Sequence, residues 1–206
     1  HTLAPKCLPG LCRSLPLLVF SFILLAAPAR AGEDHSHHQH HAMASAPALR
    51  ISQASYTLPD IRLVSNKGQA TDLNALARTE PLIVNFIFTT CTAICPIQTA
   101  TFSQLDKSLA KEGIRARLVS ISIDPENDTP QQLARYASKF GASDNWIFLT
   151  GDKQDIIDMQ KAFDAFRGNK MNHEPIAFIR KNMNAAWTRI EGFSSATDIL
   201  TEYSKQ

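Results

Sequence analysis

Residues 82–96 read LIVNFIFTTCTAICP and combine a strand pattern with a cysteine motif. Its first half is a short apolar run rich in β-branched and aromatic residues, which predicts a buried central strand over residues 82–89. Its second half places Cys91 and Cys95 four residues apart, directly before Pro96. Proline is favoured in the first turn of a helix, where its missing N–H has no partner to lose. We therefore expect both cysteines at or just before the beginning of a helix.

The expected position of Cys91 and Cys95 at a helix start determines how readily their thiols ionise. Residues four apart in a helical turn face the same way, with Cβ atoms about 5–6 Å apart. The unpaired N–H groups and the helix dipole stabilise thiolates, so we expect both sulfurs to ionise below the free pKa of about 8.5. Two such thiolates can form a disulfide or bind a soft metal ion, and the rest of the sequence has to discriminate between these uses.

Length and charge bound the class of protein. The chain has 206 residues, enough for one domain with a hydrophobic core of its own. Its formal charge is +2, and removing residues 1–31 takes away three basic residues and no acidic one, which leaves −1. Neither value indicates a nucleic-acid surface, so we expect no nucleic-acid partner.

Residues 1–31 have the pattern of a secretory signal peptide. Lys6 and Arg13 form a positive n-region, residues 15–27 are apolar, and residues 29–31 give a small-x-small cleavage site. We expect cleavage after Ala31 and a periplasmic location. The apolar run is shorter than the roughly 20 residues of a membrane span, and an uncleaved membrane anchor is the alternative.

Residues 32–48 form a polar tract that contains five histidines. Its composition predicts a disordered linker, which either binds metal loosely or is a solvated tail. The folded domain is then expected over residues 49–206.

The number of cysteines helps to decide between a structural disulfide and a reactive or metal-binding pair. Cys7 and Cys12 lie in the signal segment, so cleavage leaves Cys91 and Cys95 as the thiols of the mature chain. A lone pair in an exported protein is by default a structural disulfide. Closing a loop of only five residues stabilises a fold little, however, which favours a reactive or metal-binding pair. A structural bridge stays open as an alternative.

The remaining pattern predicts an α/β domain in which one sheet is flanked by helices, a three-layer sandwich with an added N-terminal β-hairpin. The expected strands after the hairpin begin at Leu82, Arg115, Trp146, Ile176 and Ala186. Expected helices follow Pro96, Thr129, Asp152 and Ser195. Thr129 is predicted to cap its helix, with Gln132 completing a capping box, and the helix after Asp152 is expected to reach about Phe166.

Three polar residues outside the cysteine pair are further candidates. His173, the one histidine of the expected domain, lies in a polar loop ahead of a strand, and such a loop can approach the end of a neighbouring strand. Asp124 and Asp128 follow the second buried strand, where they either form a turn and helix cap or lie near the edge that carries the cysteines. We expect structural use for Asp128, whereas the use of Asp124 stays open. We also expect the Glu174–Pro175 bond to be cis.

Together these segments resemble the Sco/SenC copper chaperones. The likeness rests on residues 86–96 with the Cys-x-x-x-Cys-Pro motif, on residues 122–130 with Asp-Pro-x-x-Asp-Thr-Pro, and on the single late histidine. Members of that family are thioredoxin-like proteins that assemble the binuclear copper centre of cytochrome c oxidase. The resemblance implies a thioredoxin-like fold and a copper ion bound by Cys91, Cys95 and His173.

Elementary coordination chemistry agrees with copper. Thiolates are soft donors that select Cu(I), whereas structural zinc needs a fourth ligand, for which Asp124 could serve. Oxidation of the two thiolates to a disulfide would release the metal and couple binding to redox state. The expected function is a periplasmic copper chaperone whose partners are a copper-centre subunit of cytochrome c oxidase, or a similar copper protein, and a thiol reductant.

A thiol-disulfide oxidoreductase that reduces the cysteines of a copper-protein client is the alternative. The three residues between Cys91 and Cys95 favour metal binding, since two residues are typical of the oxidoreductases. Pro175, directly before an expected strand, favours the oxidoreductase, because thioredoxin-type enzymes carry a cis-proline at that place.

Overall fold

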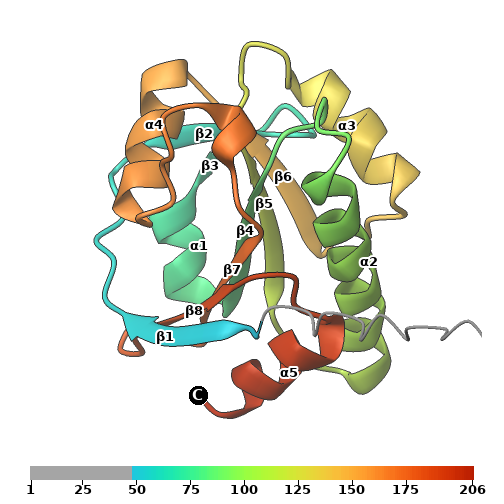
Figure 1. The fold of residues 1–206 in the computed structure, drawn as a ribbon, viewed down its shortest axis with the longest axis vertical. Helices are drawn as coiled ribbons and strands as arrows, with labels where there is room; N and C mark the ends of the chain where they lie inside the picture. The colour runs from blue at the N-terminus through green and yellow to red at the C-terminus, as the bar shows by residue number, and fades with distance from the viewer. Residues whose placement is uncertain (1–47) are drawn as a thin grey trace, which may run out of the picture. The chain divides into compact units, whose positions relative to one another are not determined.

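The structure is a computed structural model that describes residues 48–206. Its described part forms one eight-stranded sheet in the order β1-β8-β7-β4-β5-β6-β2-β3 (Figure 1). The strands are β1 (Arg50–Ala54), β2 (Arg62–Ser65), β3 (Ala70–Asp72), β4 (Leu82–Ile87), β5 (Arg117–Ser122), β6 (Trp146–Thr150), β7 (Ile176–Arg180) and β8 (Trp187–Glu191). The helices are α1 (Leu73–Thr79), α2 (Ile94–Glu112), α3 (Pro130–Lys139), α4 (Lys153–Ala162) and α5 (Ala196–Ser204), with a short 3₁₀ turn, η1 (Lys170–Asn172). The expected signal peptide and nearly all of the histidine-rich tract lie outside the described residues.

β4 is the central strand, as its apolar sequence predicts. It pairs in parallel with β5 and antiparallel with β7, and all six of its residues are buried. A strand covered on both faces needs apolar side chains on both, which is why residues 82–87 show no polar alternation. The prediction of an α/β domain with this strand at the centre of one sheet is confirmed.

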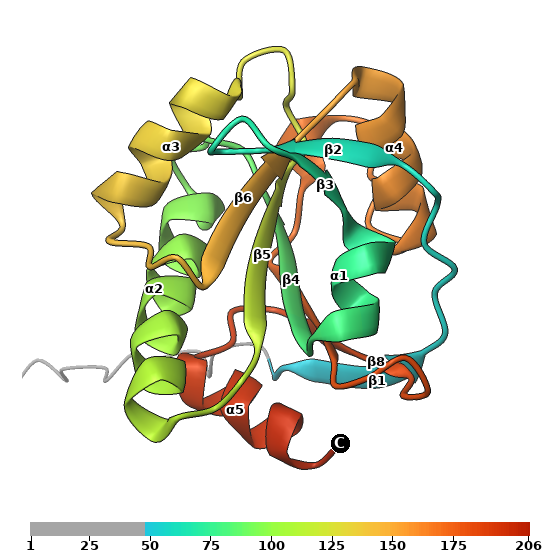
Figure 2. The same ribbon diagram turned by 180° about the vertical axis from the view of Figure 1, so that it is seen from behind.

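The helices cover the two faces of the sheet in separate layers (Figures 1 and 2). Ile83 and Ile87 of β4 pack with apolar residues of α2, α3 and α5. Val84 and Phe86, which point the other way, pack with residues of α1 and α4. Alternate residues of one strand therefore belong to two separate cores, and this gives the three layers.

An aromatic cluster fills the core beneath α1 and α4. Phe178 lies with its ring centroid 4.7 Å from that of Phe163, 5.7 Å from that of Tyr56 and 6.0 Å from that of Phe86. The rings of Phe178 and Phe86 are nearly perpendicular, at 87°. Edge-to-face pairs of this kind add to the free energy gained from burial alone.

The helix ends follow the sequence signals with two differences. The Thr129 hydroxyl caps α3 by accepting from the Gln132 N–H at 3.3 Å, but the Gln132 side chain donates to Thr89 Oγ1 instead of returning to the cap. The capping box is therefore only half formed. α4 ends at Ala162, earlier than expected, and the chain turns at Asp164, whose φ is 51°.

Two elements do not follow from the sequence patterns. β1 pairs antiparallel with β8, although four of its five residues are exposed and it carries little apolar sequence. α1 is only seven residues long and begins at an Asp72 cap. None of the helices within residues 48–206 is both long and apolar enough to cross a membrane.

Phe178→Ala is expected to lower the free energy of unfolding by about 3–5 kcal/mol, because it leaves a cavity at the centre of the aromatic cluster. Urea denaturation followed by circular dichroism measures the change. Phe193→Ala is the matched control: this ring is 51% exposed, so the change should stay within about 0.5 kcal/mol. Equal losses in the two variants would contradict the placement of Phe178 in the core.

Candidate functional site

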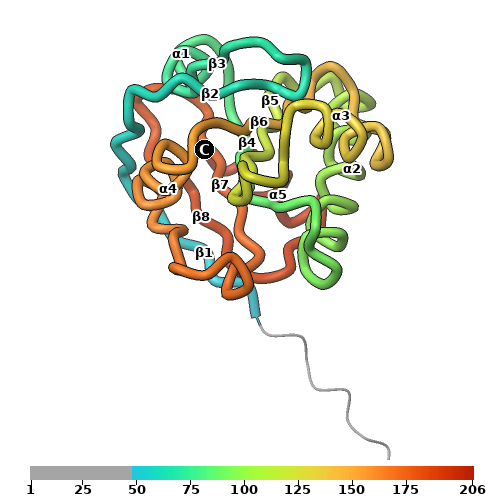
Figure 3. Tube along the Cα trace, turned by 90° about the horizontal axis from the view of Figure 1, so that it is seen from above, coloured from blue at the N-terminus to red at the C-terminus, as the bar shows by residue number. Residues whose placement is uncertain are grey.

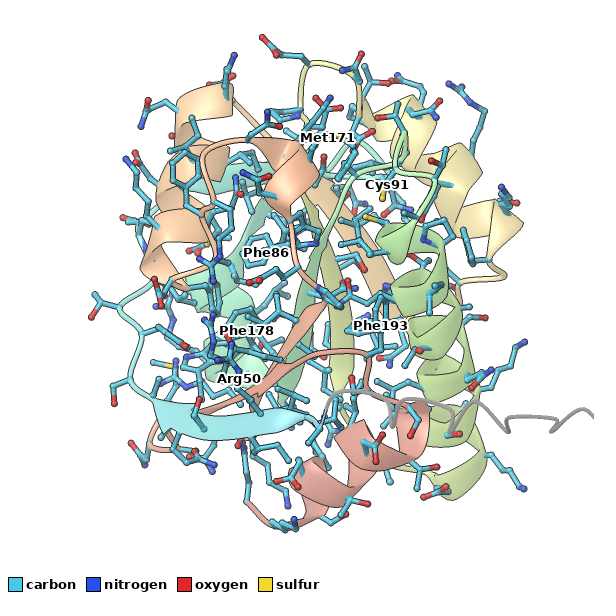
Figure 4. The ribbon with its side chains drawn as sticks, in the orientation of Figure 1. Arg50, Phe86, Cys91, Met171, Phe178 and Phe193 are labelled. Atoms are coloured by element: carbon cyan, nitrogen blue, oxygen red, sulfur yellow. The ribbon has the colours of Figure 1, made fainter. Side chains whose placement is uncertain are left out.

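The carboxyl ends of β4 and β5 bring the candidate residues to one edge of the sheet. Cys91 follows β4, Asp124 follows β5, and η1 lies between α4 and β7 in the chain. Figure 3 views the fold from above, with β4 lying between α4 and α2. Figure 4 shows Cys91 and Met171 of η1 at this end of the molecule. A parallel strand pair always delivers its carboxyl ends to one edge, and this places the site.

The cysteine loop, residues 88–93, joins β4 to α2, and the helix begins without a capping side chain. Ala93 occupies the N-cap with φ −110° and ψ −83° and gives no side-chain hydrogen bond. The Cys95 N–H donates instead to the Cys91 sulfur, with 3.5 Å between the two atoms. Cys91 is itself held by its N–H, which donates to the Phe88 carbonyl at 3.2 Å. The Cys91 sulfur therefore takes the place of the missing cap, and both cysteines are free thiols.

The two thiols lie in different environments. Cys95 is fully buried, and this burial raises its pKa to about 12 against a hydrogen bond from the Phe88 backbone. Burial also acts to raise the pKa of Cys91, but backbone N–H groups of residues 93–95 outweigh it and the pKa is lowered. The expectation that both sulfurs ionise easily holds for Cys91 and is wrong for Cys95, because the helix terminus does not offset the loss of water around a buried sulfur.

Asp128 anchors the strand ends beneath this loop. Its carboxylate is completely buried and accepts from the Thr89 N–H at 3.1 Å, from the Thr89 hydroxyl at 2.5 Å and from the Ser122 hydroxyl at 2.6 Å. Thr89 follows β4 and Ser122 ends β5, so one carboxylate fastens both strands where the cysteine loop begins. The structural use expected for Asp128 agrees with these contacts.

Asp124 is held in an ion pair. Lys170 of η1 donates to its Oδ2 at 2.6 Å, and the Asn127 amide donates to both carboxylate oxygens at 3.0 and 3.1 Å. The carboxylate thus already has donors around it in this structure. Asp124 therefore contacts η1, the turn that precedes His173, through its partner Lys170.

His173 is buried and bound to the backbone of β4. Its Nε2 lies 2.9 Å from the Phe86 carbonyl oxygen. A carbonyl only accepts, so Nε2 carries the proton and Nδ1 keeps the lone pair. Burial lowers the pKa of His173 below 6.5, against the opposing effect of the Phe86 hydrogen bond, so the ring is neutral at pH 7. A neutral imidazole with one nitrogen on a carbonyl is in the state that binds metals.

The structure brings together two of the three predicted ligands. Cys91 and Cys95 are in contact, whereas no cluster of three His, Cys, Asp or Glu side chains among residues 48–206 is placed to hold a metal ion. Two thiols as a donor set fit a soft ion, and His173 as third ligand stays a prediction.

The predicted cis bond before Pro175 is wrong, since residues 48–206 contain no cis peptide bond. In its trans form the His173–Pro175 segment still reaches the sheet, because the Gly192 N–H donates to the Pro175 carbonyl at 2.9 Å. The feature that most favoured an oxidoreductase is therefore missing.

Three residues of the site were not singled out from the sequence. Thr89 and Ser122 are ordinary strand-end residues, and only the position of Asp128 between them reveals their use. Lys170 lies in a polar loop with no distinguishing neighbour, so no sequence signal identifies its pairing with Asp124.

The fold and the site place this protein in the class of thioredoxin-like α/β domains that carry a pair of thiols at the start of a helix. The SCO1/SenC family model matches residues 50–203, and the chain belongs to that family. The SCO1 protein homolog of Bacillus subtilis (strain 168) is 40% identical over 105 residues, which are 50% of this chain and 54% of the relative. The chain thus aligns with about half the length of the curated relatives that it matches.

Solved structures agree with the fold. BsSco, described as a Sco-family cytochrome c oxidase assembly protein with a disulfide switch, superposes with a TM-score of 0.65 at 29% identity and covers 75% of this chain and 95% of its own. Yeast Sco1 with copper bound superposes with a TM-score of 0.59 at 19% identity, over 73% of this chain and 96% of its own. The second likeness is one of fold alone.

Cys91 is expected to react with iodoacetamide far faster than Cys95, because its sulfur is accessible and its pKa is lowered. The rates are measured on reduced Cys95→Ser, which keeps Cys91, and on Cys91→Ser, which keeps Cys95. The first variant should react at pH 8, and the second should react far more slowly at the same pH, because burial raises the pKa of Cys95. Equal rates in the folded variants, with equal rates in urea as the reference, would contradict the different burial of the sulfurs.

Asp128→Ala is expected to lower the free energy of unfolding by about 1–3 kcal/mol, since the Thr89 and Ser122 donors lose a buried acceptor. Hydrogen exchange should also become faster at the Thr89 amide, which loses its partner. Asp144→Ala is the control, because this carboxylate is exposed and pairs only with Lys67 at the surface. A stability unchanged by Asp128→Ala would refute the anchoring role.

Proposed function

We propose that this chain is an exported copper chaperone that carries copper on Cys91 and Cys95, with His173 as third ligand. The observation that carries this proposal is that two free cysteines lie together at the helix start, the Cys95 backbone N–H donating to the Cys91 sulfur at 3.5 Å. Soft thiolates brought together at a partly exposed edge suit Cu(I) as cargo. Membership of the SCO1/SenC family supports copper over zinc.

The third ligand needs a local movement. His173 is neutral and keeps its Nδ1 lone pair, so its chemistry suits coordination. Since no three ligands are clustered in the described residues, the cysteine loop or the η1 turn has to shift for the imidazole to join the sulfurs. Cu(I) is satisfied by two thiolates, whereas Cu(II) prefers the added nitrogen, so the movement would matter most for the oxidised ion.

The proposed setting is the periplasm, with cleavage after Ala31 and a membrane anchor as the alternative. The proposed client is the copper-centre subunit of cytochrome c oxidase or a similar copper protein, consistent with the description of BsSco as an oxidase assembly protein. A thiol reductant is required, because a Cys91–Cys95 disulfide has lost two electrons and both thiolate donors.

Thiol-disulfide exchange with a copper-protein client is the second candidate function. It is favoured by the unequal thiols: Cys91 is accessible with a lowered pKa, and Cys95 is buried with a pKa of about 12. An attacking thiol beside a protected resolving thiol is the arrangement that such exchange requires. The trans bond before Pro175 and the three-residue spacing of the cysteines weigh against it.

Reduced protein beginning at Ala48, which lacks the histidine tract, should bind one copper ion in an anaerobic Cu(I) titration with a competing chelator. Cys91→Ser and Cys95→Ser should each abolish tight binding, because a hydroxyl is not a soft anionic donor at neutral pH. His173→Ala should keep Cu(I) on the two thiolates and weaken Cu(II) more strongly.

The disulfide form of the same protein is the control for this titration and should bind almost no copper. Equal binding by the oxidised and reduced forms would mean that the cysteines are not ligands, and the chaperone proposal would fail. If copper does not bind but Cys95→Ser traps a mixed disulfide with an oxidised client peptide, exchange is the function instead.

A further inference from the structure

Lys170 makes two contacts at the edge that carries the thiols. Its ammonium group lies 2.6 Å from Asp124 Oδ2 and 5.6 Å from the centroid of the Phe88 ring. The Asp124 side chain is 6% exposed and that of Lys170 is 37% exposed. The first contact reaches the end of β5, and the second reaches the segment that leads from β4 to Cys91.

The ion pair is a firm attachment. A buried carboxylate that loses its cation is left as an uncompensated charge, which is far costlier than the loss of a surface pair. The other two ion pairs near this turn differ in kind: Lys153–Glu126 and Arg167–Glu174 each include a carboxylate more than 60% exposed. Pairs of that kind stabilise little.

Lys170 and His173 are parts of one turn. The His173 N–H donates to the Lys170 carbonyl at 3.1 Å, and the Asn169 side chain caps the turn by accepting from the Met171 N–H at 2.9 Å. The imidazole then rests on Phe86, two residues before the ring that Lys170 covers. The contacts of Lys170 and His173 thus attach both ends of the turn to residues 86–88, where the chain leaves β4.

We propose that Lys170 and Asp124 are positioning residues that hold the His173 imidazole on the Phe86 carbonyl, with Nδ1 as the nitrogen free for copper. The copper part of this inference rests on the proposed function, while the positioning part does not. Asp124, considered from the sequence as a possible fourth ligand, acts here through Lys170. The pair does not touch the metal and acts only on the third ligand.

The cavity beside the turn provides a matched control. It measures about 450 Å³ and is lined by residues that include Asp124, Lys153, Lys170 and His173. Lys153 lines the same cavity and also carries an ion pair, but that pair is exposed and not connected to the histidine turn. Lys153→Met therefore makes the same change of charge and side chain as Lys170→Met without releasing the turn.

The first measurement needs no copper. Full-length reduced protein labelled with ¹⁵N-histidine is studied by NMR, and the His173 ring signals are assigned by their loss in His173→Gln. The parent protein should show one tautomer with the proton on Nε2. Lys170→Met and Asp124→Asn should each give exchange between tautomers, whereas Lys153→Met and the charge-keeping Lys170→Arg should retain the parent pattern.

The second measurement follows Cu(II) affinity by competition in the same full-length variants, so that the histidine tract contributes equally to all. Lys170→Met should weaken the His173-dependent affinity by about 10- to 100-fold, the usual effect of a lost supporting contact around a metal ligand. Cu(I) affinity should change little, because the two thiolates remain. Lys153→Met should match the parent protein.

Lys170→Met leaves Asp124 unpaired, so the double variant Asp124→Asn/Lys170→Met, without the buried charge, secures a folded protein. It should show the same tautomer exchange as the single variants, with no further loss. A single Nε2–H tautomer in the folded double variant, or equal effects of Lys153→Met and Lys170→Met, would overturn the inference. If the tautomer changes as expected but the parent protein binds no copper, the proposed function fails and the positioning role stands.

Discussion

The site depends on one buried carboxylate, that of Asp128. Three donors from Thr89 and Ser122 converge on it, so the ends of β4 and β5 are fastened to the same group. Two segments of the site leave the sheet just beyond these ends: the cysteine loop after Thr89, and the Asp124 segment after Ser122. A buried charge is stable only when its hydrogen bonds are complete, so this anchor also restricts how both segments can move.

The parts of the fold with strong local signals could be predicted from the sequence. The largely apolar run of β4 indicated a central strand, and the Thr129-Pro130 pair indicated where α3 begins. β1 could not be found this way, because its strand state depends on pairing with β8, more than 130 residues further along, and not on its own composition. The end of α4 was predicted too late because Phe163 continues the helical spacing of apolar residues. It is a buried core residue, but it lies just after the helix.

The cysteine pair at a helix start was predictable from the sequence, but the arrangement of the groups around it was not. The cysteine spacing and the position of Pro96 correctly indicated two thiols at a helix start. The pKa of each thiol, however, depends on tertiary burial, which differs between Cys91 and Cys95 and leaves no trace in the motif. Likewise, the Lys170–Asp124 pair joins residues 46 positions apart, and nothing in the sequence around either residue indicates that they pair.

The two tryptophans lie on opposite faces of the sheet. Trp146 packs with Phe102 and Phe148 in the core beneath α2 and α3, and its indole N–H donates to Ser120 at 2.9 Å. Trp187 belongs to the other core, with its ring 5.1 Å from that of Phe163. The protein therefore carries one tryptophan in each of these two cores. Because α2 also carries Cys95, a Trp187→Phe variant would leave Trp146 as the single tryptophan, and its emission would then report on the layer that holds the thiols.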